Sequence, residues 1–154
     1  WRASGSRRPS PSGRSALAHA LLRASAMTGD HRYREHAERA LGTAAVLATR
    51  APRFVSWALA AAEAAQTGPA EVAVVGSSGD PVRDLLLKTA LAHAMPGSAV
   101  VVGPPDMPDA GIPLLAARPL VEGQAAAYVC RQFVCRRPVT DVTALVSELT
   151  LRSP

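Results

Sequence analysis

The 154-residue sequence predicts a mixed α and α/β fold, in which helices precede a small β-α-β plus hairpin unit. Apolar residues recur at helical spacing over residues 14–66. Short β-branched runs replace that pattern from residue 70 onward. The helix-ending dipeptide Gly68-Pro69 separates the two patterns. We therefore expect a disordered basic lead-in over residues 1–13, helices over 14–68 and a small α/β unit over 69–154.

The first part should contain three helices, over about 14–28, 31–49 and 53–66. Leu17, Leu21 and Leu22 give the first helix its apolar face. Gly29 is expected to end it, and the side chain of Asp30 to cap the next helix by accepting a backbone N–H.

The second and third helices each carry one apolar stripe. The stripe of the second is Tyr33, Ala37, Leu41, Ala44 and Leu47, and that of the third is Phe54, Trp57, Ala61 and Ala65. We interpret Phe54 and Trp57 as core residues. Because alanine offers little apolar area to bury, three such helices make a weak core by themselves. We therefore interpret them as the end of a larger helical array.

The second part begins with a strand over residues 71–75 and the turn Gly76-Ser77-Ser78-Gly79. Asp80 and Pro81 then predict the start of a helix that runs to about residue 94. Leu85, Leu86 and Leu91 are expected to supply much of its buried face. The remaining predicted elements are a strand over 98–102, a loop over 103–113, a partly extended stretch over 114–120, a hairpin of 125–129 with 133–135, and a helix over 141–151.

Composition and charge narrow the function classes. The formal net charge is +5. Four of the 17 basic residues are arginines in the first fourteen residues, which hold no acidic residue. The rest of the chain carries the other 13 basic residues and all 12 acidic ones, so it is nearly neutral. A surface that tracks phosphates is strongly basic, so nucleic-acid binding is disfavoured. The apolar runs are too short to span a bilayer. The Arg- and Ala-rich composition indicates a GC-rich, bacterial coding sequence. The start at Trp1 favours a fragment, and the lack of a hydrophobic signal segment predicts a cytoplasmic protein.

Four stretches together resemble one family. They are Pro11-Ser-Gly-Arg-Ser-Ala-Leu-Ala-His19, Thr28-Gly-Asp30, Glu71-Val-Ala-Val-Val-Gly76 and Ala127-Tyr-Val-Cys-Arg-Gln-Phe-Val-Cys-Arg-Arg-Pro138. They resemble the C-terminal end of the thioredoxin-domain-containing proteins related to spermatogenesis-associated thioredoxin-like proteins. Arg14 stands where that family often has Asn.

The resemblance implies a fold and partners. Residues 14–68 would be the closing helices of an (α/α)6 toroid similar to six-hairpin glycosidases and sugar epimerases. The missing toroid helices and a thioredoxin-like domain with a Cys-x-x-Cys motif would belong to the same chain. The whole protein would act on carbohydrate or in thiol redox chemistry, with this part non-catalytic alone. Phe54 and Trp57 would stack on a sugar if the toroid cavity were complete.

Cys130 and Cys135 form the first candidate site. Their spacing differs from the C-x-x-C of redox dithiols and zinc sites. Flanking a four-residue hairpin turn, they would face each other across the strands. Arg131, Arg136 and Arg137 would favour the reactive thiolate. One interpretation is a redox-sensitive pair, and the other is two buried or reduced structural thiols in a cytoplasmic protein, where disulfides are uncommon.

Gly76, Ser77, Ser78 and Gly79 form the second candidate site, between a strand and a helix. Their backbone N–H groups would cradle an anionic ligand, which makes a free-standing small-molecule binding module the alternative function. The competing interpretation is a tight turn capped by Asp80, because the third Gly of a Rossmann motif and the Lys of a Walker loop are absent. No metal or cofactor is predicted, since His19, His31, His36 and His93 are not spaced as ligands.

Overall fold

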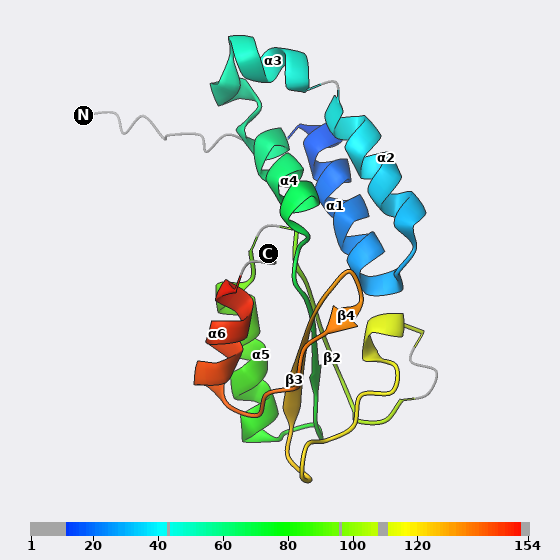
Figure 1. Ribbon diagram of the computed structural model, residues 1–154, viewed down its shortest axis with the longest axis vertical. Coiled ribbons are helices and arrows are strands. Elements are labelled where there is room, and N and C mark those ends of the chain that lie inside the picture. Colours follow the sequence, from blue (N-terminus) through cyan, green and yellow to red (C-terminus); the bar gives the residue numbers. More distant parts are fainter. Residues whose placement is uncertain (1–11, 43, 96, 108–110, 152–154) are drawn as a thin grey trace, which may run out of the picture.

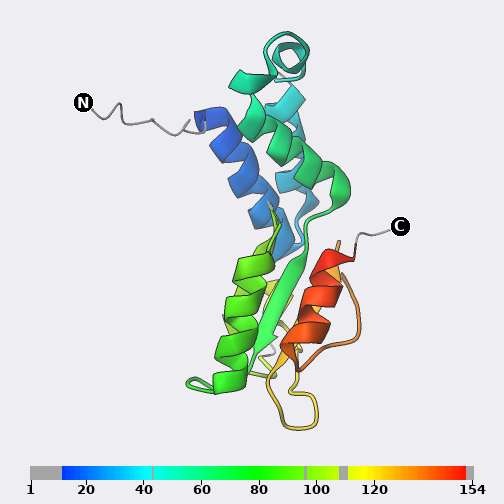
Figure 2. The same cartoon turned by 90° about the vertical axis from the view of Figure 1, so that its left-hand side faces the viewer.

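The computed structural model describes residues 12–42, 44–95, 97–107 and 111–151, so the predicted lead-in lies outside the described residues except for its last two. Helices gather at one end of an elongated molecule, and a sheet with its own helices occupies the other (Figures 1 and 2). The mixed α/β prediction is therefore confirmed. No helix of the described part is both long and apolar enough to cross a bilayer.

The helical end consists of α1 (Gly13–Thr28), α2 (His31–Gly42), α3 (Ala45–Arg50) and α4 (Ser56–Thr67). Ser12 caps α1 by accepting a hydrogen bond from the Ser15 N–H, and Gly29 ends it with φ 74°. Asp30 accepts the Arg32 N–H at 3.0 Å, as expected of a cap. The buried cluster of this end is mainly alanine with Leu22 and Leu41. The expectation of a weak core in this part stays a prediction.

Two of the three predicted helices are wrong in their extent. The expected 31–49 helix is broken, because α2 ends at Gly42, whose backbone loses the most entropy in a helix. The expected 53–66 helix is a 3-10 turn, η1 (Pro52–Phe54), followed by α4. Val55, with φ −119°, separates them. These breaks let α3 and η1 cross the far end of the other helices (Figure 1).

Only part of each predicted stripe is buried, since Leu41 and Ala61 lie in the core but other members do not. Phe54 is 75% exposed, Trp57 is 44% exposed, and Leu47 is exposed as well. The core assignment of Phe54 and Trp57 is therefore wrong. The prediction from spacing assumed one continuous helix packed against one neighbour. Among the described residues, no element covers the side of η1 and α4 that carries Phe54 and Trp57.

The sheet has the order β2-β1-β3-β4. β1 (Glu71–Val75) pairs in parallel with β2 (Ala99–Gly103) and antiparallel with β3 (Ala126–Arg131), which pairs with β4 (Val134–Cys135). The parallel pair is joined by α5 (Pro81–His93), so the predicted β-α-β unit is confirmed. The stretch after residue 113 begins with a 3-10 turn, η2 (Pro113–Leu115), and α6 (Val142–Thr150) ends the unit.

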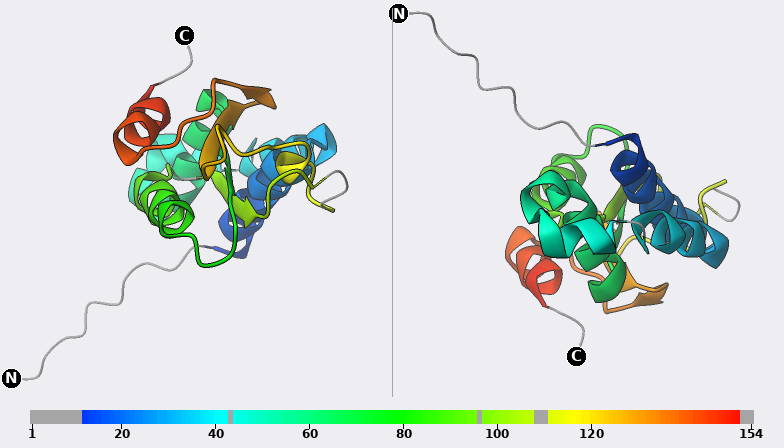
Figure 3. Two further views of the ribbon diagram at one scale, coloured as in Figure 1. Left: turned by 90° about the horizontal axis from the view of Figure 1, so that it is seen from below. Right: turned by 90° about the horizontal axis from the view of Figure 1, so that it is seen from above.

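Both faces of the sheet are buried. This burial holds for the two central strands, β1 and β3. Side chains alternate across the sheet, so Val72, Val74 and Val129 pack on α5 and α6. Ala73 and Tyr128 pack on the other face, against Leu114 of η2 and residues at the end of α1. Figure 3 shows these layers along the long axis. The sheet is therefore the middle layer of the α/β unit.

The expected buried face of the 81–93 helix is only partly correct. Leu86 is fully buried between the sheet and α6, but Leu85 is 53% exposed and Leu91 is also exposed. Leu85 and Leu86 point about 100° apart on the helix, and the sheet and α6 cover the side that carries Leu86. The spacing identified a helix, but only the position of the sheet selected its buried side.

Polar contacts join the two ends of the molecule. The Arg131 guanidinium donates to the carbonyl oxygen of Gly68, after α4, at 3.0 Å and to that of Leu151, after α6, at 2.7 Å. The Phe133 ring covers Gly29, where an added Cβ would lie 3.2 Å from its Cζ. The hairpin of β3 and β4 is therefore fixed to both the helical end and the C-terminal helix.

Candidate redox site

The β3–β4 hairpin turns through Gln132 and Phe133. Both residues have positive φ, 51° and 61°. Two such residues between paired strands form the tight turn that matches strand twist, for which Gly, Asn and Asp are the favoured residues. A Gln-Phe pair costs more in this conformation, so the surroundings must hold it. The hairpin was predicted from the sequence, but its expected four-residue turn is wrong, because Arg131 pairs with Val134 and leaves only two residues in the turn.

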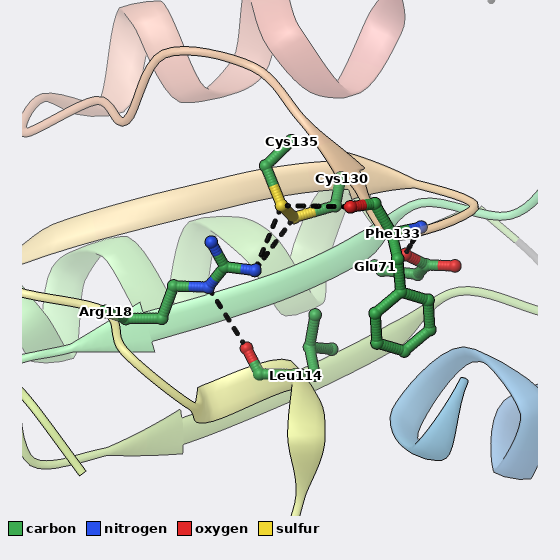
Figure 4. Close-up of a disulfide and its surroundings, with 6 residues drawn as sticks. All are labelled: Glu71, Leu114, Arg118, Cys130, Phe133 and Cys135. Carbon is green, nitrogen blue, oxygen red and sulfur yellow. Dashed lines mark hydrogen bonds between the residues drawn. A yellow bond between two sulfur atoms is a disulfide. The ribbon is translucent and has the colours of Figure 1, made fainter. Parts of the chain in front are cut away.

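Cys130 and Cys135 are directly opposed in this hairpin and are joined by a disulfide (Figure 4). Cys130 is 1% exposed and lies in the buried cluster beneath the sheet, whereas Cys135 is partly exposed. The two cysteines therefore differ in exposure. Redox activity of the pair stays a prediction.

The positive group at the sulfurs belongs to Arg118. Its Nη2 lies 3.0 Å from Cys135 Sγ and 3.9 Å from Cys130 Sγ (Figure 4). Its guanidinium carbon lies 5.1 Å from the centre of the Tyr128 ring, within range of a cation–π interaction. A guanidinium at this distance stabilises a thiolate once the disulfide is reduced.

Two of the three arginines expected at the sulfurs, Arg131 and Arg136, contact other groups, so that prediction is wrong for these two. Arg131 binds the carbonyls of Gly68 and Leu151, Arg136 lies 3.5 Å from Glu148 Oε2, and Arg137 is exposed. Side chains alternate along a strand, so residues next to a cysteine point away from it.

Arg118 was missed because it comes from an irregular segment. Its backbone carbonyl accepts the Asp106 N–H at 3.0 Å, and the preceding Ala117 has φ 52°. The Tyr128 hydroxyl donates to the carbonyl of Pro119 at 2.7 Å, and burial raises the pKa of Tyr128. These contacts fix the backbone on both sides of Arg118. No spacing rule connects such a segment to a hairpin 12 residues later.

Glu71 holds the other side of the turn. Its carboxylate is 5% exposed at the start of β1, and its Oε2 accepts the Phe133 N–H at 2.7 Å (Figure 4). Burial raises the pKa of Glu71, although the backbone N–H groups of Phe133 and Gln132 and the charge of Arg131 oppose the rise.

We expect Glu71 to give the protein stability that depends on pH. Because its pKa is raised on folding, its contribution is fully present below the unfolded value of about 4.5 and is lost as pH rises through the folded value. Urea unfolding between pH 4 and 8 should show the free energy of unfolding of the parent falling relative to Glu71→Gln as pH rises. The same difference rising with pH would contradict this assignment.

The turn Gly76-Ser77-Ser78-Gly79 connects β1 to α5, with Ser77, Ser78 and Gly79 exposed and Gly76 buried. The donors at the start of α5 are already occupied, since Asp80 Oδ1 accepts the N–H groups of Val82 and Arg83 at 2.8 and 3.4 Å. Arg83 Nη1 donates to the carbonyl oxygen of Ser77. An anion here would compete with a carboxylate, and ligand binding at this turn stays a prediction.

The structure does not bring the histidines together as ligands. Among the described residues, no group of three or more His, Cys, Asp or Glu side chains is placed to hold a metal ion. His19 lies at the exposed end of the helices, with its ring edge-on to Trp57 at 6.2 Å, and His93 bonds within α5.

Comparison with known proteins adds no relative. No protein-family model, curated protein or solved structure matches the chain. The resemblance to the thioredoxin-domain proteins therefore has the quoted sequence stretches as its only support.

Proposed function

We propose that Cys130–Cys135 is a redox-active disulfide in the C-terminal part of a thioredoxin-domain-containing toroid protein. Its exchange partner would be the dithiol of that protein's thioredoxin-like domain. This part of the chain is not catalytic alone. The observation that carries the redox proposal is the position of the Arg118 guanidinium, 3.0 Å from Cys135 Sγ.

Exchange would proceed at Cys135, the more exposed cysteine. A thiolate of the partner attacks Cys135 Sγ, the Cys130–Cys135 bond breaks, and Cys130 leaves as a thiolate that takes a proton from water. The second partner thiol loses its proton, attacks the mixed disulfide and releases Cys135 as a thiolate beside Arg118. Two electrons pass from the partner dithiol, which becomes a disulfide, to the hairpin cysteines, which become thiols.

The asymmetry of the pair suits the reverse direction as well. The Cys135 thiolate, stabilised by Arg118 and accessible, attacks an oxidised partner, and buried Cys130 resolves the mixed disulfide. We place the protein in the cytoplasm, where glutathione keeps most thiols reduced and the disulfides that do occur are usually transient. A pair that cycles between both states fits that compartment better than a permanent crosslink.

Replacing Arg118 by Gln should weaken the reactive thiolate. In the reduced protein, we expect alkylation of Cys135 by iodoacetamide at pH 7 to slow by roughly tenfold. The reduction potential of the pair should fall by about 30 mV for each tenfold loss in stability of the reduced form. Equilibration with glutathione buffers and mass spectrometry of the alkylated peptides measure both quantities.

The matched control is Arg137→Gln, which removes an equal charge two residues from Cys135 at an exposed position. It should change neither quantity by more than about twofold. Equal effects of the two variants would reject a specific role for Arg118. Two free thiols in air-equilibrated protein, counted before and after reduction, would reject the disulfide itself.

The proposed context has a separate test. We expect the gene upstream of the Trp1 codon to continue in frame and to encode further helices and a Cys-x-x-Cys motif. A stop codon followed by a start site at that position would reject the toroid assignment. The redox properties of the pair can still be measured in that case, so the two parts of the proposal fail separately.

A further inference from the structure

A cavity of about 480 Å³ lies at the helical end, and none of its lining residues belongs to the sheet that carries the disulfide. It is formed by the first turns of α1 and α4, the end of α2, and the α3–η1 segment. This volume falls in the range of small-molecule sites, about 300–1,000 Å³. The cavity is separate from every residue in the proposed redox site.

The wall of the cavity is mainly apolar and includes two exposed aromatic rings. Leu41 and Leu47 line it together with Phe54 and Trp57. The Phe54 ring is 75% exposed, so its burial contributes almost nothing to the stability of the fold. It lines the same cavity as the Trp57 ring. Flat apolar surfaces of this kind bind the body of a ring-containing ligand.

The charge of the lining residues is of one sign. Arg14, in the first turn of α1, and Arg53, in η1, both line the cavity, and none of the described lining residues is acidic. The Arg53 guanidinium carbon lies 4.8 Å from the centre of the Phe54 ring, so charge and aromatic surface adjoin. A ligand with an anionic group and an apolar body satisfies both features.

We propose that this cavity binds small organic anions whose apolar body is a ring system and whose carboxylate, sulfonate or phosphate pairs with Arg53 and Arg14. The rings of Phe54 and Trp57 hold the body of the ligand. The two guanidiniums select the anion over its neutral analogue.

Two fluorescent probes that differ only in charge test the proposal. 1-Anilinonaphthalene-8-sulfonate carries a sulfonate, and N-phenyl-1-naphthylamine is the same molecule without it. We expect saturable one-to-one binding of the sulfonate, with quenching of Trp57 emission in a Trp1→Phe background. Arg53→Gln and Arg14→Gln should each weaken its binding by about tenfold and leave that of the neutral probe within about twofold.

Arg50→Gln is the matched control, because Arg50 is exposed at the end of α3 and does not line the cavity. It should leave both probes unaffected, whereas Trp57→Ala should weaken both. Equal loss of the two probes in Arg53→Gln would overturn the proposal, as would equal effects of Arg50→Gln and Arg53→Gln. Probe binding that falls with rising protein concentration, together with a dimer in sedimentation, would show instead that a second copy covers this face.

Discussion

Replacing Leu86 by Ala should lower the free energy of unfolding by about 2–5 kcal/mol. Leu86 is fully buried in α5, within the cluster formed by one sheet face and α6. The loss combines the transfer free energy of the removed carbons with the cost of the cavity left between three rigid elements. Urea unfolding followed by circular dichroism measures it.

The neighbouring Leu85 supplies a matched control, since the same substitution there removes the same atoms from a largely exposed side chain. Leu85→Ala should change the free energy of unfolding by no more than about 0.5 kcal/mol. Comparable losses at the two positions would show that α5 is rotated relative to the sheet.

Replacing Gly97 by Ala should cost about 2–5 kcal/mol, from two sources. Gly97 has φ 84°, which costs an L-residue about 1–2 kcal/mol. An added Cβ would also lie 2.7 Å from the Cβ of Ala64 in α4, so the chain must shift, at about 1–3 kcal/mol. Thermal or urea unfolding of the variant measures the sum.

Gly123→Ala separates these two sources, because Gly123 has φ 77° and no atom near an added Cβ. It should lose only the conformational part, about 1–2 kcal/mol. In the Gly97→Ala background, Ala64→Gly should then recover stability that it does not provide in the parent. If Ala64→Gly has the same effect in both backgrounds, the close approach of α4 to the loop before β2 is not the cause of the lost stability.

The sequence predicted most elements of the α/β unit because their signals are local. Asp80-Pro81 fixes the start of α5 through its own carboxylate and ring, and Gly29 ends α1 through its positive φ. The opposed cysteines followed from their position on either side of a short turn. Each of these features depends on a few neighbouring residues, which a single sequence displays.

The candidate sites were predicted less completely. Cys130 and Cys135 were identified, but Arg118 contacts them from a distant irregular segment, and Glu71 holds their turn from another strand. Phe54 and Trp57 were assigned to a core that does not cover them. These errors share one cause. A single sequence does not show which distant segments pack together or which of their sides are in contact.

The sequence by itself determined the β-α-β unit, the end of α1, the start of α5, the near-neutral body and the opposed cysteines. The tertiary structure decided which leucine of α5 is buried, which guanidinium reaches the sulfurs and which aromatic rings line a cavity. Helix and turn signals come from backbone conformation within a few residues. Burial and electrostatic contact depend instead on the packing of segments that are far apart in the chain, and periodicity supplies a set of candidate faces without choosing among them.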